Sequence, residues 1–180
     1  MLDACVLYPA PLRDSLMRLA VTDLFKARWT DMIHEEWIRN LEGKIPRDRL
    51  DKVRDLMDEN VRDAKIEGFE FLIDTLKLPD PDDRHVLAAA IHSKSDAIVT
   101  FNQKDFPSEY LASFDIELIH PDDFIVYQFE FDPGAVLESF KRQRKSLKNP
   151  KMVVDEFIDC LYKQQLPQTA NVLTGYKDLI

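Results

Sequence analysis

A short apolar segment, Ala97–Phe101, limits the possible folds of this chain more than any other feature of its sequence. The segment is rich in β-branched residues and almost continuously apolar, which is typical of a parallel strand buried on both faces. Glu117–Ile119 predicts a second strand of this kind, and Pro121 begins a helix directly after it. Because strands that alternate with helices form layered α/β folds, we expect a central parallel sheet flanked by helices.

Helical patterns fill most of the remaining chain. Apolar residues recur at helical spacing within residues 12–26, 30–41 and 46–61. Asp80 and Pro81 predict the start of a further helix, because Asp is a favoured N-cap and Pro is favoured at the first helical position. Met1–Pro9 is predicted as a very short strand that ends in a turn. The residues beyond Phe131 are predicted to be helical.

The composition narrows the classes of protein to which the chain can belong. Its 33 acidic and 24 basic residues give a formal net charge of −9, which argues against a protein that coats nucleic acid through bulk charge. Cys5 and Cys160 are too few for a disulfide framework and are interpreted as small core residues in a reducing compartment. We see neither an apolar run of membrane-spanning length nor a signal peptide, so we expect a cytoplasmic protein without membrane contact.

Several common catalytic motifs are absent from the sequence. It contains no Gly-rich phosphate loop, no nucleophile elbow and no pair of cysteines with zinc-site spacing. The four His residues are scattered, and each is interpreted as a surface or packing residue. The chemistry is therefore expected from acidic residues.

Acidic residues lie where predicted strands end and where a helix begins. Asp3 follows the first strand, Asp82 and Asp83 open the helix at Pro81, and Asp105 lies just beyond the next strand. In open α/β sheets, ligands bind beyond the carboxyl ends of the strands. Carboxylates that converge there repel one another unless a hard cation lies between them, and Mg²⁺ suits because it prefers oxygen ligands. The placement therefore favours a metal site.

Each of these acids also has a purely structural interpretation. Asp80 is explained as an N-cap, Asp82 and Asp83 would complement the helix dipole by ~0.3–1 kcal/mol each, and Asp105 would form a turn or a cap. Asp83 differs because it shares a helix face with the apolar residues that follow it. A carboxylate on an apolar face needs a partner, which favours a metal ligand at this position.

Three segments taken together resemble the PIN-domain nucleases, and most of all the VapC-like toxins of bacterial toxin–antitoxin systems. They are Leu2–Tyr8, Asp80–Ala90 and Val99–Pro107, in this order and spacing. The resemblance covers residues 1–128, interpreted as a PIN-like nuclease domain. It leaves residues 129–180 as a helical C-terminal extension with a basic segment. It implies a three-layer α/β fold with a central parallel sheet.

The resemblance also implies a set of site residues. PIN-domain nucleases cleave RNA with Mg²⁺ or Mn²⁺ held by three or four acids. Carried over, the catalytic residues are Asp3, Glu36, Asp83 and Asp105, and the metal ligands among them are Asp3, Asp83 and Asp105. Helical phase supports Glu36 over its neighbour Glu35, because Glu35 groups with other charged residues on one helix face.

Further residues and partners follow from the same resemblance. Asp82, Thr100 and Asn102 are predicted to support the metal ligands. The implied partners are an RNA substrate, a cognate antitoxin protein and a second copy of the chain in a homodimer. Two alternatives stay open: a non-catalytic PIN-fold module that binds RNA or protein, and a metal-dependent DNA nuclease or phosphatase.

A basic segment lies in the C-terminal extension. Lys141–Lys151 holds six basic residues and no acidic residue. A run of this kind is usually a solvated helix face, and the alternative is that it follows an RNA backbone. In that alternative, the RNA contacts come from Lys141, Arg142, Arg144 and Lys145.

Overall fold

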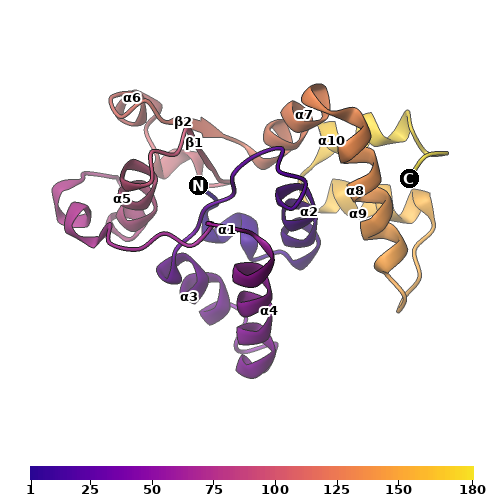
Figure 1. The fold of residues 1–180 in the computed structure, drawn as a ribbon, viewed down its shortest axis with the longest axis horizontal. Helices are drawn as coiled ribbons and strands as arrows, with labels where there is room; N and C mark the ends of the chain where they lie inside the picture. The colour runs from indigo at the N-terminus through magenta and orange to yellow at the C-terminus, as the bar shows by residue number, and fades with distance from the viewer. The chain divides into compact units, whose positions relative to one another are not determined.

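The computed structural model describes all 180 residues and groups them into two compact units. Unit 1 contains Met1–Tyr8 and Lys26–His120, and unit 2 contains Pro9–Phe25 and Pro121–Ile180 (Figure 1). This division differs from the predicted boundary between residues 128 and 129, which falls inside a helix. It also assigns an early segment of the chain to unit 2. No helix is both long and apolar enough to cross a membrane.

Unit 1 is built on a small parallel sheet. Strand β1 (Ala97–Val99) pairs in parallel with β2 (Glu117–Ile119), and Val99 lies opposite Ile119. On the other edge of β1, Leu2 forms an isolated parallel bridge with Val99. The two apolar segments thus form the parallel pair that the sequence predicts, and the chain has an α/β fold.

The first segment of the chain differs from the prediction. Only Leu2 pairs with the sheet, and the chain then enters helix α1 (Ala4–Leu7) instead of continuing as a strand. The physical reason is the carboxylate of Asp3, which accepts a hydrogen bond from the backbone N of Ala4 at 2.6 Å and caps the helix. Strand and helix therefore meet at Asp3.

The helices of unit 1 follow the sequence pattern closely. Thr30 caps α3 by accepting a hydrogen bond from the backbone N of Ile33, and Asp80 caps η2 through the backbone N of Asp82. The apolar stretch Val86–Ala90 of α5 is fully buried. The helical elements are α3 (Asp31–Arg39), α4 (Arg47–Asn60), η1 (Glu70–Thr75), η2 (Pro81–Asp83), α5 (Arg84–His92), η3 (Gln103–Asp105) and α6 (Ser108–Ala112).

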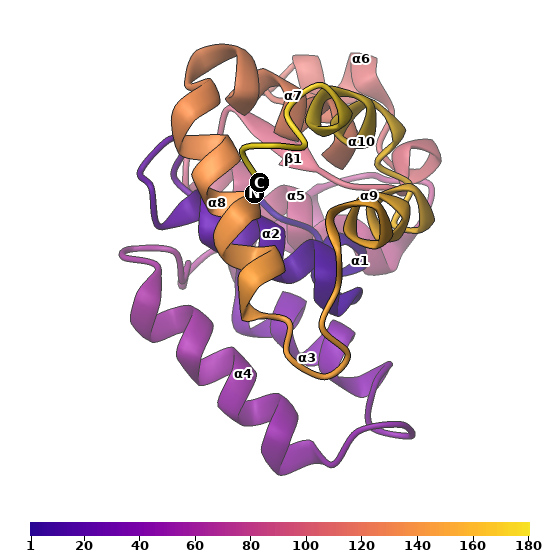
Figure 2. The same cartoon turned by 90° about the vertical axis from the view of Figure 1, so that its right-hand side faces the viewer.

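Unit 2 is a helical bundle, as Figure 2 shows for its C-terminal part. Helix α8 contacts both α2 and α7, and α10 contacts both α7 and α9. The buried carboxylate of Asp122 accepts hydrogen bonds from the backbone N of Gln168 and of Thr169, at the start of α10. The helices are α2 (Ala10–Ala20), α7 (Pro121–Phe131), α8 (Pro133–Ser146), α9 (Val154–Lys163) and α10 (Pro167–Thr174). The predicted helical C-terminus is confirmed.

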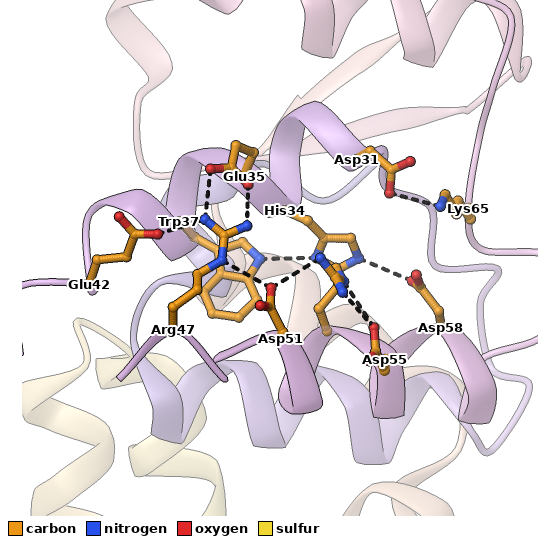
Figure 3. A network of polar contacts seen from close by, with 11 residues as sticks. Asp31, His34, Glu35, Trp37, Glu42, Arg47, Asp51, Asp55, Asp58 and Lys65 are labelled. Carbon is orange, nitrogen blue, oxygen red and sulfur yellow. Dashed lines mark hydrogen bonds and ion pairs between the residues drawn. The ribbon is translucent and has the colours of Figure 1, made fainter. Parts of the chain in front are cut away.

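A buried hydrogen-bond network fixes helix α3 against α4 (Figure 3). Asp58 accepts a hydrogen bond from Trp29 Nε1 at 2.7 Å and lies 3.1 Å from Nε2 of His34. The other ring nitrogen of His34, Nδ1, accepts a hydrogen bond from Trp37 Nε1 at 3.1 Å. Burial lowers the pKa of His34. The ring is therefore a neutral tautomer that carries its proton on Nε2 and donates it to Asp58.

We expect Asp58→Ala to lower the free energy of unfolding by about 2–4 kcal/mol, because two buried donors lose their acceptor. Asp58→Asn keeps an oxygen at Oδ1, the atom that both donors bond, and loses only the charge, so it should cost less than Asp58→Ala. Urea unfolding followed by circular dichroism measures both variants. Asp55→Ala is the matched control, since Asp55 is exposed and pairs with Arg54 at the surface, and it should cost less than about 1 kcal/mol. Equal losses for Asp55→Ala and Asp58→Ala would contradict the role of the network.

Candidate functional site

Asp3 lies at the carboxyl end of the sheet and is held from several sides. Its backbone N donates to the carbonyl of Val99, and its side chain is almost fully buried. Thr100 Oγ1 donates to Asp3 Oδ2 at 2.6 Å, and Cys5 Sγ donates to the same oxygen at 3.0 Å. Burial raises the pKa of Asp3, and the charge of Glu36 raises it further. Hydrogen bonds thus fix the orientation of the carboxylate, while burial makes its charge electrostatically costly.

Asp83 lies at the junction of η2 and α5 and is held by the loop after β1. Asn102 Nδ2 donates to Asp83 Oδ2 at 3.0 Å. The backbone N of Asn102 donates in turn to Thr100 Oγ1 at 2.9 Å. Thr100 and Asn102 therefore connect Asp3 to Asp83 through one short chain of hydrogen bonds. Both residues lie where the sequence predicts support for the acids.

Three carboxylates from two segments come close together. Asp80, Asp83 and Asp105 each offer an oxygen, and these oxygens lie within 4.8 Å of one another. Asp80 is exposed, whereas Asp83 and Asp105 are half-buried. Oxygen ligands gathered in this way suit Mg²⁺ or Mn²⁺, because hard cations bind carboxylates. We call this group the carboxylate cluster.

The electrostatics of Asp83 join the carboxylate cluster to the other predicted acids. The pKa of Asp83 is raised to about 7 by burial, which is the largest cause, together with the charges of Asp3, Asp80, Glu36 and Asp105 in that order. An acid that four neighbouring carboxylates disfavour as an anion lies in a region of strongly negative potential. Of the four predicted acids, Asp83 and Asp105 belong to the carboxylate cluster, while Asp3 and Glu36 act on the charge of Asp83 from outside it. Perturbed acids of this kind are common at functional sites.

Glu36 and Glu35 point to different surroundings, as their helical phase predicts. Glu36 is half-buried, and its Oε2 lies 3.4 Å from Nε2 of His85. Glu35 is exposed and forms two hydrogen bonds with Arg47, which also bonds Glu42 and Asp51 (Figure 3). Glu36 therefore faces the acidic region, and Glu35 belongs to a surface ion-pair network that joins α3 and α4.

Three residues near the site make contacts that the sequence did not predict. Asp80 does cap η2, as predicted, but its carboxylate also belongs to the carboxylate cluster. His85 is buried beside Glu36, and its Nδ1 has no hydrogen-bond partner. Cys5 hydrogen-bonds the Asp3 carboxylate, and its pKa is raised to about 12 by burial and by the Asp3 charge. Only the spacing of Asp80 and Asp83, about one helical turn apart, could have indicated from the sequence that Asp80 joins the cluster.

Asp82, predicted as a supporting residue, is exposed and contributes its backbone N to the Asp80 cap.

The basic segment is less uniform than its sequence suggests. Arg142 is exposed and pairs with Glu138, and Lys145 is exposed on α8. Arg144 is half-buried, and its guanidinium donates to the backbone carbonyls of Met152 and Ile180. Lys141 is half-buried as well. Arg144 therefore stabilises the local fold of unit 2, unlike the exposed cations around it.

Comparison with known proteins adds to this geometry. The family model described as "PIN domain" matches residues 1–104, which is more than half of the chain. The chain belongs to the PIN-domain family. This confirms the family that the three sequence segments indicated, and the α/β fold of unit 1 is a PIN fold.

Two further matches concern the relatives of this PIN domain. A family model described as "VapC50 C-terminal domain" matches residues 121–175, all within unit 2. The protein named "Putative ribonuclease VapC50" from Mycobacterium tuberculosis is 35% identical over 88 residues, a match that covers 49% of this chain and 52% of that protein. The chain thus spans about half the length of the curated relative that it matches. No solved structure matches it.

The raised pKa of Asp83 predicts how stability depends on pH in the PIN domain. Between its ordinary value of 3.8 and about 7, the folded state binds a proton that the unfolded state has released. The contribution of Asp83 to stability is therefore full below pH ~4 and is lost as the pH rises through 7. Asp83→Asn cannot ionise and should escape this loss.

We expect Asp83→Asn in EDTA to raise the free energy of unfolding at pH 8 by about 1–2 kcal/mol relative to its effect at pH 4, after allowance for solvent screening. Urea unfolding at both pH values measures this difference. Asp82→Asn is the matched control, because the Asp82 side chain is exposed, and its effect should vary little with pH. An Asp83→Asn effect that is equal at both pH values would contradict the electrostatic argument.

Proposed function

We propose that this protein is a metal-dependent endoribonuclease on a three-layer PIN fold and the toxin of a bacterial toxin–antitoxin pair. The observation that carries the proposal is the convergence of acids from separate segments, above all the carboxylate cluster of Asp80, Asp83 and Asp105. The name of the M. tuberculosis relative, which says ribonuclease, supports the reaction class. The match of unit 2 to a VapC50 C-terminal domain supports the toxin assignment.

The residues of the site fit a divalent cation. Every donor in the carboxylate cluster is a carboxylate oxygen, which favours Mg²⁺ or Mn²⁺ over metals that prefer sulfur or imidazole. The charges around Asp83 disfavour its anionic form, and a cation would remove this cost. Asp3, Asp83 and Asp105 are the proposed metal ligands, and Asp80 joins them.

The residues of the chain would divide the work of phosphodiester hydrolysis. Asp3, Asp83 and Asp105 would hold the divalent cation, which would supply the chemistry of activating a water molecule and neutralising charge on the phosphate. Thr100 and Asn102 keep the carboxylates of Asp3 and Asp83 in fixed orientations through their hydrogen bonds. Glu36, whose Oε2 lies 3.4 Å from Nε2 of His85, would orient water or accept a proton from it.

The partners of the proposed nuclease follow from the same assignment. An RNA substrate is compatible with the acidic sequence because a bound cation attracts phosphate where bare carboxylates repel it. A cognate antitoxin and a homodimer are the proposed protein partners. Both rest on the resemblance to VapC-like toxins.

Two other functions compete with this proposal, and one experiment separates them. The protein is incubated with Mg²⁺ or Mn²⁺ and with single-stranded RNA, structured RNA or DNA. The proposed function predicts cleavage of RNA that EDTA abolishes, and loss of this cleavage in Asp83→Asn. Cleavage of DNA alone would favour a DNA nuclease. Cation-independent RNA binding without cleavage would favour a non-catalytic PIN module.

We expect Glu36→Gln to lower the single-turnover rate of RNA cleavage by two or more orders of magnitude, because a general base or metal-facing carboxylate typically contributes that much. Glu35→Gln is the matched control one residue away. Glu35 pairs with Arg47 at the surface, so its loss should leave the rate nearly unchanged and cost below about 1 kcal/mol of stability. Rates at saturating Mn²⁺ decide between them. An inactive Glu35→Gln beside an active Glu36→Gln would reverse the assignment.

A second proposal concerns the basic segment. We propose that its exposed cations, Arg142, Lys145, Lys148 and Lys151, bind the RNA backbone. Their exposure on and just after α8 supports this role, although Arg142 already pairs with Glu138. The half-buried Lys141 remains a candidate for RNA binding beside them. Arg144 does not, because its guanidinium donates hydrogen bonds to two backbone carbonyls.

Neutralising Arg142, Lys145, Lys148 and Lys151 to Gln should weaken RNA binding and reduce the slope of log affinity against log salt by about 0.7 for each phosphate that these cations neutralise. Arg144→Gln is the comparison: it should lower the free energy of unfolding by about 1–3 kcal/mol and leave the salt slope unchanged. Fluorescence anisotropy with labelled single-stranded RNA measures the slope. An unchanged slope in the fourfold variant would assign the segment to solvent or to a protein partner.

A further inference from the structure

A pocket lies beside the acidic region of unit 1. It has a volume of about 380 Å³ and is lined by Ala4, Cys5, Tyr8, Glu36 and Asn40. This volume is within the range of about 300–1,000 Å³ that is usual for pockets that bind small ligands. Two of its wall residues belong to the proposed site: Glu36 is one of its acids, and Cys5 donates to the Asp3 carboxylate. The pocket is therefore a neighbour of the place where cleavage would occur.

A cation is hydrogen-bonded to one wall residue of this pocket. Lys44, in the turn after α3, donates a hydrogen bond from Nζ to the hydroxyl oxygen of Tyr8 at 2.9 Å. This hydrogen bond raises the pKa of Lys44, so the ammonium stays charged at neutral pH. Its exposed position leaves it open to solvent and to an anionic group.

The geometry of Lys44 also bears on the Tyr8 ring. The ammonium lies 5.7 Å from the ring centroid and 2.9 Å from the hydroxyl oxygen. The 5.7 Å distance to the centroid is close to the sum of two lengths. These are the 2.9 Å hydrogen bond and the distance from the ring centre to the hydroxyl oxygen of Tyr8. The ammonium therefore lies near the ring plane, beyond the hydroxyl. Tyr8 lines the pocket, and its hydroxyl oxygen accepts the hydrogen bond from Lys44.

The chemistry of these three residues matches one nucleotide of a single-stranded RNA. Bases stack on aromatic side chains, and Tyr8 offers such a ring at the pocket wall. An Asn amide has both a donor and an acceptor and reads a base edge, and Asn40 is exposed at the same wall. An ammonium neutralises a backbone phosphate, and the exposed Lys44 bonds the hydroxyl of Tyr8.

We propose that this pocket binds the base of one nucleotide next to the scissile phosphate, with the ring of Tyr8 as its stacking partner, the Asn40 amide as the reader of its edge, and Lys44 on the adjoining phosphate. The placement of this nucleotide relative to the cut rests on the proposed nuclease function, whereas nucleotide binding by the pocket does not. The pocket would thus select which single-stranded sequence enters the acidic region.

The test measures binding apart from cleavage. Asp83→Asn protein in EDTA is titrated into fluorescein-labelled oligoadenylate, oligocytidylate and oligouridylate, and anisotropy gives the affinities. Tyr8→Ala should weaken binding about tenfold because stacking is removed, whereas Tyr8→Phe should stay within about twofold of the parent. Asn40→Ala should reduce the spread of affinities among the three oligonucleotides. Lys44→Met should lower the salt slope by about 0.7.

Controls keep the outcomes distinct. Lys52→Met removes an exposed lysine of α4 and should not change the salt slope. If Tyr8→Ala does not fold, as judged by circular dichroism, the surface variants Asn40→Ala and Lys44→Met still decide the matter. Competition by adenosine monophosphate that depends on Asn40 would support a nucleotide pocket. Unchanged affinity, base preference and salt slope in the pocket variants would overturn the proposal.

The result is separable from that of the proposed function. Cleavage of RNA by the wild type, together with pocket variants that bind as the parent does, would retain the nuclease and reject the pocket. Binding that depends on Tyr8 and Asn40, together with no cleavage under any metal, would retain the pocket and reject the nuclease.

Discussion

The backbone pairing at Val99 positions most of what is proposed for the site. Val99 pairs with Leu2 on one side and with Ile119 on the other, so the residues that leave the sheet at this point emerge side by side. Asp3 follows Leu2, and Thr100 follows Val99, which is why Thr100 can donate to the Asp3 carboxylate. Two residues later, Asn102 reaches Asp83. A sheet with two short strands and one bridge thereby orients acids from two distant segments.

The acids of this region lower stability, and the rest of unit 1 must offset that cost. Burial and the neighbouring carboxylates raise the pKa values of Asp3 and Asp83, so a negative charge on either residue is electrostatically costly. The neighbouring network of Trp29, His34 and Asp58 shows the opposite arrangement, since each buried polar atom in it has a partner. Satisfied polar groups fix α3, while unsatisfied charge is concentrated where α3 presents Glu36. This contrast is expected of a site that needs a cation to complete it.

The sequence predicted the parts of this arrangement that depend on local pattern and missed those that depend on distant contacts. The β-branched run at Ala97–Phe101 and the Asp80–Pro81 helix start depend on neighbouring residues alone, and both predictions were confirmed. The phase of α3 separated Glu36 from Glu35 for the same reason. The residues of helix α1 were predicted to form a strand. They form a helix because the Asp3 carboxylate caps it, and the apolar pattern does not show this cap. No periodicity in the sequence reveals the contact between His85 and Glu36. The same is true of the hydrogen bonds that Arg144 donates to the backbone carbonyls of Met152 and Ile180.

The acidic net charge and an RNA substrate become compatible when the charges are considered locally. At physiological salt, exposed charges are screened beyond about 8 Å, so a phosphate at the site responds mainly to the nearest groups and little to the total of −9. In the proposed arrangement the nearest groups are carboxylates, which would repel the phosphate, and Lys44, which would attract it. A divalent cation among the carboxylates would turn their repulsion into attraction and leave the attraction by Lys44 unchanged. Cation and RNA would therefore each strengthen the binding of the other, as linkage requires. In the proposed arrangement the pocket would supply sequence preference that is independent of the cation, and the acids would supply affinity for phosphate only when the cation is bound.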